Sequence, residues 1–211
     1  MLLHGLARTR HAMRKMERQL QKAGYITANF TYPSTRHPVE TLTEYAIPPA
    51  IEYCQDQGAQ KIHFVTHSLG GILLRFYLQH LTPTTVDIGR IVMLAPPNHG
   101  SEIVDKLGNW ILFGLFNGPA GPQLGTDLNS MPNQLGAIVH EAGIITGNRR
   151  LDPFAWLIPG ESDGKVSVLS AKLEGMQDFL ILPVSHTFLM NDISVIEQTL
   201  YFLEYGRFQR S

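Results

Sequence analysis

The segment 61–76 constrains the fold more than any other, because it must pass from a strand to a helix within a few residues. It reads KIHFVTHSLGGILLRF. The β-branched, apolar run 62–65 is typical of a buried strand, and the apolar residues from Ile72 onward suit a buried helix. Gly70 and Gly71 supply small residues where the chain has to turn sharply. The segment therefore predicts a strand, a tight turn and a helix in immediate succession.

Ser68 lies at the tip of this predicted turn. The residues from Thr66 to Gly70 follow the pattern G-x-S-x-G, except that Thr66 stands at the first glycine position. In such an elbow the hydroxyl is exposed, and the N-terminus of the following helix points toward it. The N–H of Leu69 would then face a negative charge that forms on a substrate attacked by Ser68. The alternative is a glycine-containing turn with an incidental serine.

Strand-like and helical patterns alternate along most of the chain. Strands are expected at residues 1–4, 25–30, 62–65, 89–95, 143–147 and 179–183, and residues 155–159 could extend or follow the fifth of them. Helices are expected at residues 9–23, 38–57, after Ser68 and at 193–205, with a kink or break at Pro48 and Pro49. This alternation predicts an α/β fold with a minimal, mostly parallel sheet of about six strands and helices on both faces.

Residues 101–136 interrupt this alternation. Their centre, from Trp110 to Phe116, is aromatic and apolar, and a loop rich in glycine and proline follows it. We expect a single domain over residues 1–211, in which the insertion forms a lid or an acyl-binding wall with Trp110 and Phe113 as substrate-binding side chains. An additional core helix is the other interpretation, because apolar periodicity does not separate the two.

A serine hydroxyl becomes a good nucleophile only when a base takes its proton, and the base needs an acid that orients it. Ser68, Asp163 and His186 occur in this chain order, and each follows a predicted strand. Because the carboxyl ends of parallel strands meet at one edge of a sheet, we expect the three side chains to lie together. An ordinary turn residue at Asp163 and a surface-loop histidine at His186 are the alternatives.

Other residues could take the roles of the acid and the base. Glu161 and Asp152 are the further candidates for the acid, and His140 and His99 for the base, although neither histidine has the expected chain position. His67 is expected to pack against the elbow, because its side chain leaves the turn in another direction than that of the serine.

The pair His4-Gly5 follows the first predicted strand. The glycine allows a sharp turn, after which the next amide can point into a site. Leu6 would be that donor, with Ala7 as the alternative. An ordinary turn between a strand and a helix is the competing interpretation.

Composition argues against several classes of protein. The formal net charge of −1 gives no reason to expect a nucleic-acid partner. Cys54 is the only cysteine, which leaves no internal disulfide and no cysteine-based zinc site. No acidic cluster accompanies the nine histidines, and we expect neither a metal nor a cofactor.

No apolar run is long enough to span a membrane, and the apolar start is too short for a signal peptide. We therefore expect a cytoplasmic protein. The chain opens inside an expected strand, so an upstream segment could precede it.

Taken together, these features resemble the α/β-hydrolase superfamily, in particular its small bacterial lipase- and esterase-type members. The matching parts span nearly the whole chain: His4-Gly5-Leu6, the elbow 66–71, the stretch LAPPNHGS at 94–101, Asp163-Gly164 and His186. Two features depart from the pattern, since Thr66 replaces the usual glycine and the chain starts at what resembles the third strand of the full fold.

The resemblance implies a serine ester hydrolase without a cofactor. In it Ser68 would form an acyl-enzyme, His186 would carry the proton and Asp163 would orient His186. The amides of Leu6 and Leu69 would form the oxyanion hole. The apolar insertion favours an aliphatic or aromatic acyl group in a small ester substrate.

A thioesterase and an amidase are alternatives, because the triad does not choose the leaving group. An acyltransferase with the same triad is a further alternative, which would have to exclude water and bind an alcohol acceptor. A non-catalytic binding protein on the same scaffold is the alternative from another class, since fold does not fix function. The sequence does not give the oligomeric state.

Overall fold

The computed structural model describes residues 1–80, 86–107, 118–153 and 155–210. Their strands form one sheet, in which neighbours pair in chain order and every pair is parallel. The strands are β1 (Leu2–Leu3), β2 (Lys61–His67), β3 (Asp87–Leu94), β4 (Ala142–Gly147) and β5 (Asp178–Leu182). The expected α/β fold with a mostly parallel sheet is confirmed, with five strands in place of about six.

The segment 25–30 is the expected strand that does not form a full ladder. Asn29 makes a single parallel bridge with Leu2, and the N–H of Leu2 donates to the carbonyl of Ala28 at 2.8 Å. Because β1 has only two residues, it offers the segment too few backbone groups for a longer ladder. It still lies on one side of β1 while β2 lies on the other, so the direction of winding reverses at β1. In open α/β sheets, ligands bind at the carboxyl ends of the strands at such a reversal.

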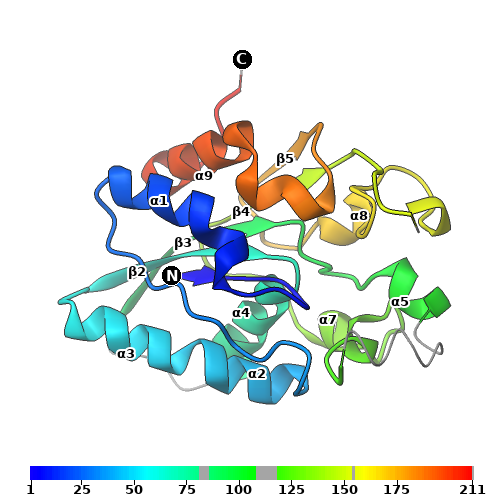
Figure 1. Cartoon of the computed structure of the whole chain (residues 1–211), viewed down its shortest axis with the longest axis horizontal. Helices are drawn as coiled ribbons and strands as arrows, with labels where there is room; N and C mark the ends of the chain where they lie inside the picture. Colours follow the sequence, from blue (N-terminus) through cyan, green and yellow to red (C-terminus); the bar gives the residue numbers. More distant parts are fainter. Residues whose placement is uncertain (81–85, 108–117, 154, 211) are drawn as a thin grey trace.

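Helices cover both faces of this sheet (Figure 1). On one face lie η1 (Arg10–Met13), α1 (Arg14–Lys22) and α9 (Ile193–Tyr205), and on the other α2 (Val39–Ala46), α3 (Pro48–Asp56) and α4 (Leu69–His80). The break between α2 and α3 falls at Ile47, directly before the two prolines, as predicted.

Short helical elements gather beyond the carboxyl ends of the strands. Three of them, α5, α7 and α8, are labelled on the right-hand side of Figure 1. The short elements are α5 (Glu102–Leu107), η2 (Pro122–Leu124), α7 (Met131–Gln134), η3 (Ala155–Leu157), α8 (Val168–Ala171) and η4 (His186–Asn191). Within the described part of the chain, no helix has the length and apolar character that crossing a bilayer requires.

Alternating side chains of the strands fill a separate core layer on each face of the sheet. Leu3, Phe64, Met93 and Ile144 belong to one buried cluster, and Leu2, Val65, Val92 and Ile145 to the other. Phe64 has no exposed surface. Strand β2 is therefore held from both sides up to the residue that precedes Ser68.

The expected strand at residues 155–159 is wrong. The chain forms the 3₁₀ helix η3 there, because the Arg150 guanidinium gathers the carbonyls that a strand would direct to a neighbour. Its Nη2 donates to the carbonyl of Ile158 at 2.8 Å and to that of Ala155. Trp110 and Phe113 lie outside the described residues, so their expected contact with substrate stays a prediction.

Candidate functional site

Ser68 is held in an uncommon backbone conformation between β2 and α4. Its φ is +52°, a region that costs a residue with a side chain about 1–2 kcal/mol. Two hydrogen bonds maintain it, since its N–H donates to the carbonyl of Leu94 and its carbonyl accepts from the N–H of Gly71, both at 2.9 Å. The side chain is partly exposed. The fold thus presents this hydroxyl at the tip of a strained turn.

Two glycines let neighbouring backbone approach this turn. A Cβ on Gly5 would lie 2.9 Å from Nδ1 of His67 and 3.2 Å from Cβ of Ser68. A Cβ on Gly70 would lie 2.7 Å from the carbonyl oxygen of Leu3. The loop after β1 and the start of α4 can pack this closely only because both positions lack a side chain.

His186 and Asp163 form a buried pair. His186 Nδ1 lies 2.7 Å from Asp163 Oδ2, and the carboxylate has no exposed surface. The other carboxylate oxygen accepts from the backbone N–H groups of Lys165 at 2.9 Å and Val166 at 2.8 Å. A carboxylate oxygen accepts, so Nδ1 of His186 carries the hydrogen and the lone pair of the neutral ring is on Nε2.

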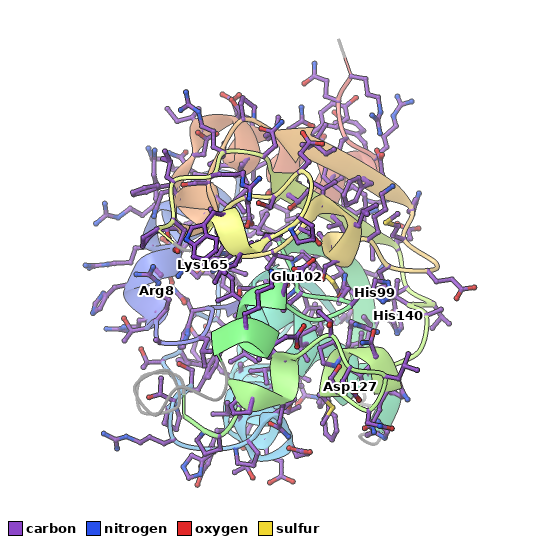
Figure 2. All side chains as sticks on the ribbon, turned by 90° about the vertical axis from the view of Figure 1, so that its right-hand side faces the viewer. Arg8, His99, Glu102, Asp127, His140 and Lys165 are labelled. Carbon is purple, nitrogen blue, oxygen red and sulfur yellow. The ribbon has the colours of Figure 1, made fainter. Side chains whose placement is uncertain are left out.

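Ser68 and His186 line the same cavity, which has a volume of about 510 Å³. Its apolar wall consists of Leu6, Pro97, Ile103, Val104, Leu124, Pro153 and Val166, and its charged side chains are Arg8, Asp152 and Lys165. Figure 2 looks onto this end of the molecule, where Arg8 and Lys165 lie close together. No hydrogen bond among the described residues joins Ser68 to His186; such catalytic bonds often tighten only when substrate binds.

The loop after β1 is fixed by His4. The N–H of Tyr32 donates to Nε2 of His4 at 3.3 Å, so Nδ1 carries the hydrogen and donates to the carbonyl of Gly5 at 2.9 Å. The His4 ring stacks on the Tyr32 ring, with centroids 3.8 Å apart, and burial lowers the pKa of His4. In a trans peptide the carbonyl and the next N–H point in opposite directions. Fixing the Gly5 carbonyl therefore orients the N–H of Leu6, a residue of the cavity wall.

Ala7 is the weaker candidate for the oxyanion donor. Its N–H already donates to the hydroxyl of Ser34 at 3.1 Å, and its φ is +53°. Such a bond makes the Ala7 amide unavailable to a substrate. Of the two amides of this loop, Leu6 therefore stays the predicted donor. Leu69, the first residue of α4, stays the predicted donor on the other side of the elbow.

His67 packs between the elbow and the loop of His186. Its Nε2 donates to the backbone carbonyl of His186 at 3.1 Å, and the two rings lie 4.8 Å apart. Burial, followed by the neighbouring His186, lowers the pKa of His67 well below its ordinary value, so the ring is neutral at physiological pH. The bond to His186 was not expected from the sequence, because the two residues are 119 positions apart.

The other candidates from the sequence lie elsewhere or have other partners. The Glu161 carboxylate accepts from Asn148 at 2.8 Å, and Asp152 lies 3.6 Å from Lys165 at the cavity wall. His99 pairs with Asn133, and His140 lines a different cavity. Of the candidate acids, Asp163 is the one whose hydrogen bond to the His186 ring is established, at 2.7 Å. The residues that the structure describes also include no group of three or more His, Cys, Asp or Glu side chains suited to a metal ion.

The stretch after β3 connects the sheet to the loop of Asp163. Asn98 is buried, accepts from the Arg75 guanidinium at 3.0 and 3.2 Å, and donates to the carbonyl of Ala171 at 2.9 Å. The Ser101 hydroxyl donates to the carbonyl of Lys165 at 2.9 Å. The contacts of Asn98 and Ser101 fix the position of the turn that contains Asp163 relative to β3. This stretch therefore has a positioning role.

Comparisons with solved structures identify the fold. The mature lipase BlEst2 of Bacillus licheniformis matches with a TM-score of 0.74 and 22% identity, over 97% of this chain and 90% of the lipase. A structure described under the metagenome-derived lipolytic enzymes LipS and LipT matches at 0.64 and 16%, over 96% and 91%. The monoacylglycerol lipase of Paleococcus ferrophilus matches at 0.61 and 15%, over 97% and 92%. No protein-family model matches the chain, and no curated protein matches its sequence significantly. At these identities the likeness establishes the fold alone.

Proposed function

We propose, on the premise that this chain has the α/β-hydrolase fold, that it is a serine hydrolase that cleaves carboxylic esters. One observation carries the proposal: the 2.7 Å contact between His186 and the buried Asp163, beside the cavity that Ser68 lines. A carboxylate on Nδ1 leaves Nε2 free to act as the base that a serine needs. The lipases and the lipolytic enzyme among the similar structures, according to their descriptions, support the ester as the class of substrate.

The reaction begins with transfer of the Ser68 proton to Nε2 of His186. The hydroxyl oxygen attacks the ester carbonyl, and the charge develops on the former carbonyl oxygen. The N–H groups of Leu6 and Leu69 donate to that oxygen, and the N-terminus of α4 adds a favourable field. Asp163 stabilises the imidazolium of His186 while the tetrahedral intermediate exists.

The intermediate collapses when its bond to the alcohol oxygen breaks. The leaving alcohol takes the proton from His186, and the acyl group stays on Ser68 as an ester. Water then enters, gives a proton to His186 and attacks the acyl carbonyl. The second intermediate releases the carboxylic acid, and the proton returns from His186 to Ser68.

The acyl group would occupy the apolar part of the cavity. Ile103 and Val104 of α5 and Leu124 of η2 contribute to it. A volume of about 510 Å³ lies within the ordinary range of small-molecule sites. This wall favours an uncharged acyl chain.

The proposal is tested with p-nitrophenyl esters of increasing acyl length. We expect hydrolysis that falls by about 10⁴-fold or more in Ser68→Ala, because loss of the nucleophile removes the acyl-enzyme route. Ser194→Ala is the matched control, since Ser194 is exposed at the start of α9. The control should hydrolyse the esters at the wild-type rate.

Reaction with a fluorophosphonate probe gives a second readout. The probe should label the wild type and Ser194→Ala, and leave Ser68→Ala unlabelled. Equal hydrolysis by Ser68→Ala and the wild type would assign the nucleophile elsewhere. A folded wild type that neither hydrolyses any ester nor takes the probe would overturn the proposed function.

A further inference from the structure

Two cations line the catalytic cavity, and only one of them has a counter-charge there. Arg8 and Lys165 are the cationic side chains of the wall, and Asp152 is its one carboxylate among the described lining residues. Asp152 lies 3.6 Å from the ammonium group of Lys165. The His67 ring is neutral at physiological pH and adds no charge to this wall. The wall therefore carries an excess of positive charge close to Ser68.

Arg8 presents an unengaged guanidinium at a defined position. Its backbone follows Ala7, which is held by the bond to Ser34, and it lies two residues after Leu6. In the described part of the chain, its side chain forms no hydrogen bond and no ion pair. A free guanidinium offers several N–H donors in a planar fork that matches carboxylate and phosphate oxygens.

Lys165 approaches the same space from the loop of the acid. Its N–H is bound by Asp163 and its carbonyl by Ser101, so its backbone is fixed on both sides. The side chain is 43% exposed and can reach toward the cavity opening. The charges of Arg8 and Lys165 both contribute to lowering the pKa of His67, although less than burial does, so their field extends to the residue beside Ser68.

On the basis of the proposed function, we infer that the preferred ester carries an anionic group on its alcohol part, and that Arg8 and Lys165 recognise this group. The apolar residues of α5 and η2 accommodate the acyl chain, whereas the cations come from the loops after β1 and around Asp163. The apolar wall thus corresponds to the acyl part of the ester, and the cationic wall to its alcohol part. A phosphate or a carboxylate satisfies this chemistry, and the two are separated by the test.

The test compares four butyryl esters that differ in the charge of the alcohol part. They are 1-butyrylglycerol 3-phosphate, 3-(butyryloxy)propanoate, neutral 1-butyrylglycerol and cationic butyrylcholine, with butyrate release followed by titration. We expect kcat/KM to be about 10-fold or more higher for an anionic ester than for the neutral one, since hydrogen bonds to charged groups are worth about 1.5–3 kcal/mol. The faster of the two anionic esters identifies phosphate or carboxylate as the group recognised.

Arg8→Gln and Lys165→Gln should lower the ratio of anionic to neutral kcat/KM, by about 10-fold for Arg8→Gln. The loss should appear mainly in KM, and added salt should reduce the preference of the wild type. Arg18→Gln is the control, because Arg18 is an exposed arginine of α1 that does not line the cavity. The control should keep the wild-type ratio.

Binding of glycerol 3-phosphate, measured by calorimetry against glycerol, separates this inference from the proposed function. Binding to the wild type that is lost in Arg8→Gln supports the anion site even if no ester is hydrolysed. Ester hydrolysis that depends on Ser68 but shows no anionic preference would overturn the anion site and leave the hydrolase intact. Weaker binding of glycerol 3-phosphate than of glycerol would overturn it as well.

Discussion

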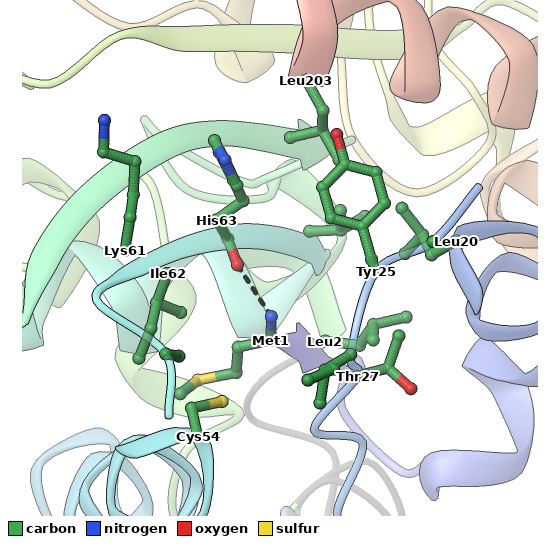
Figure 3. A pocket seen from close by; sticks show the side chains of 14 residues that line it. Met1, Leu2, Leu20, Tyr25, Thr27, Cys54, Lys61, Ile62, His63 and Leu203 are labelled. Carbon is green, nitrogen blue, oxygen red and sulfur yellow. Dashed lines mark hydrogen bonds between the residues drawn. The ribbon is translucent and has the colours of Figure 1, made fainter. Parts of the chain in front are cut away.

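Two cavities lie at opposite ends of β1 and β2, and both contain a histidine together with a residue that could act as a nucleophile. The cavity of Ser68 and His186, which we propose as the catalytic cavity, lies at the carboxyl ends of the strands. The second, of about 250 Å³, lies where the strands begin (Figure 3). Its wall is mainly apolar and includes His63, Lys61 and Cys54, and the Met1 amino group donates to the carbonyl of His63 at 2.7 Å.

The two histidines differ in what holds the ring. Asp163 binds Nδ1 of His186, whereas Nδ1 of His63 accepts from the N–H of Arg90 at 2.8 Å. No carboxylate among the described residues forms a hydrogen bond with the His63 ring. Burial lowers the pKa of His63 and raises the pKa of the Cys54 thiol, so at physiological pH the ring is neutral and the thiol is protonated.

We infer from this comparison that a nucleophile and a base lining one cavity are insufficient for ester hydrolysis by the proposed mechanism. The cavity of Ser68 adds the Asp163 carboxylate that contacts His186, the strained turn at Ser68, and the amides that we propose as oxyanion donors. These additions lie at the carboxyl end because the loops there connect strands to helices, so that helix N-termini point at the site.

The largest expected effect comes from the acid. Asp163→Asn should lower kcat for ester hydrolysis by about 10³- to 10⁴-fold, because an amide can donate to Nδ1 and so favour the wrong tautomer of His186. Steady-state hydrolysis of a p-nitrophenyl ester measures the effect. Two controls sharpen it: Glu161→Gln alters the neighbouring acid, and His63→Gln alters the histidine of the second cavity. If Asp163→Asn hydrolysed the ester near the wild-type rate while Glu161→Gln lost this activity, the acid would be Glu161.

The next effect concerns the close approach of backbone to the elbow. Gly5→Ala should lower kcat by about 10²-fold, because its Cβ would displace the loop that carries the Leu6 amide, and removal of one oxyanion donor costs about that much. Gly24→Ala is the counterpart in the second cavity, where a Cβ meets no atom within 4 Å.

Gly24 has a φ of +91°, so its replacement should cost about 1–2 kcal/mol of unfolding free energy without changing kcat. Circular dichroism in urea and the ester assay separate the two quantities. A loss of turnover in Gly24→Ala equal to that in Gly5→Ala would mean that the effect of Gly5 is general instability.

The local features of the site could be predicted from the sequence, because short segments encode them. The elbow at Ser68 and the break before Pro48 follow from apolar runs, glycines and prolines within a few residues. Chain order together with the strand pattern also placed Asp163 and His186 at one edge of the sheet, where the structure brings them into contact.

Features that depend on distant partners could not be predicted. The segment 25–30 has a strand-like sequence, yet β1 is too short to pair with more of it. Residues 155–159 also have a strand-like pattern, but Arg150 draws their carbonyls into a turn. Arg8 stands in the sequence as an ordinary surface charge, and only the fold brings it to the wall of the cavity.

The third prediction uses pH to compare the buried histidines. A histidine whose pKa is lowered by folding binds more protons in the unfolded chain than in the folded one. Its contribution to the unfolding free energy is therefore complete when the pH is above its ordinary pKa of 6.5, and is lost as the pH falls below that pKa. His67 and His63 are both of this kind. Each can contribute up to about 1.4 kcal/mol per pH unit to the slope of the unfolding free energy.

The shift is larger for His67, so His67→Gln should flatten the fall in stability between pH 6.5 and 5 more than His63→Gln does. Urea denaturation at a series of pH values gives both slopes. Equal slopes in His67→Gln and the wild type would show that folding does not lower the pKa of His67, contrary to its buried environment.

The smallest expected effect tests the comparison most directly. Cys54→Ser gives the second cavity a serine in the same wall as His63, so that this cavity has the two residue types that the catalytic cavity has in Ser68 and His186. In a Ser68→Ala background this substitution should restore no hydrolysis and no fluorophosphonate labelling, because nothing there orients the histidine or receives an oxyanion. The hydroxyl should cost about 1–3 kcal/mol of stability if it is left unpaired in this buried position. Turnover regained in the double variant would show that residue types suffice, and that neither an orienting acid such as Asp163 nor a strained elbow is needed for the chemistry.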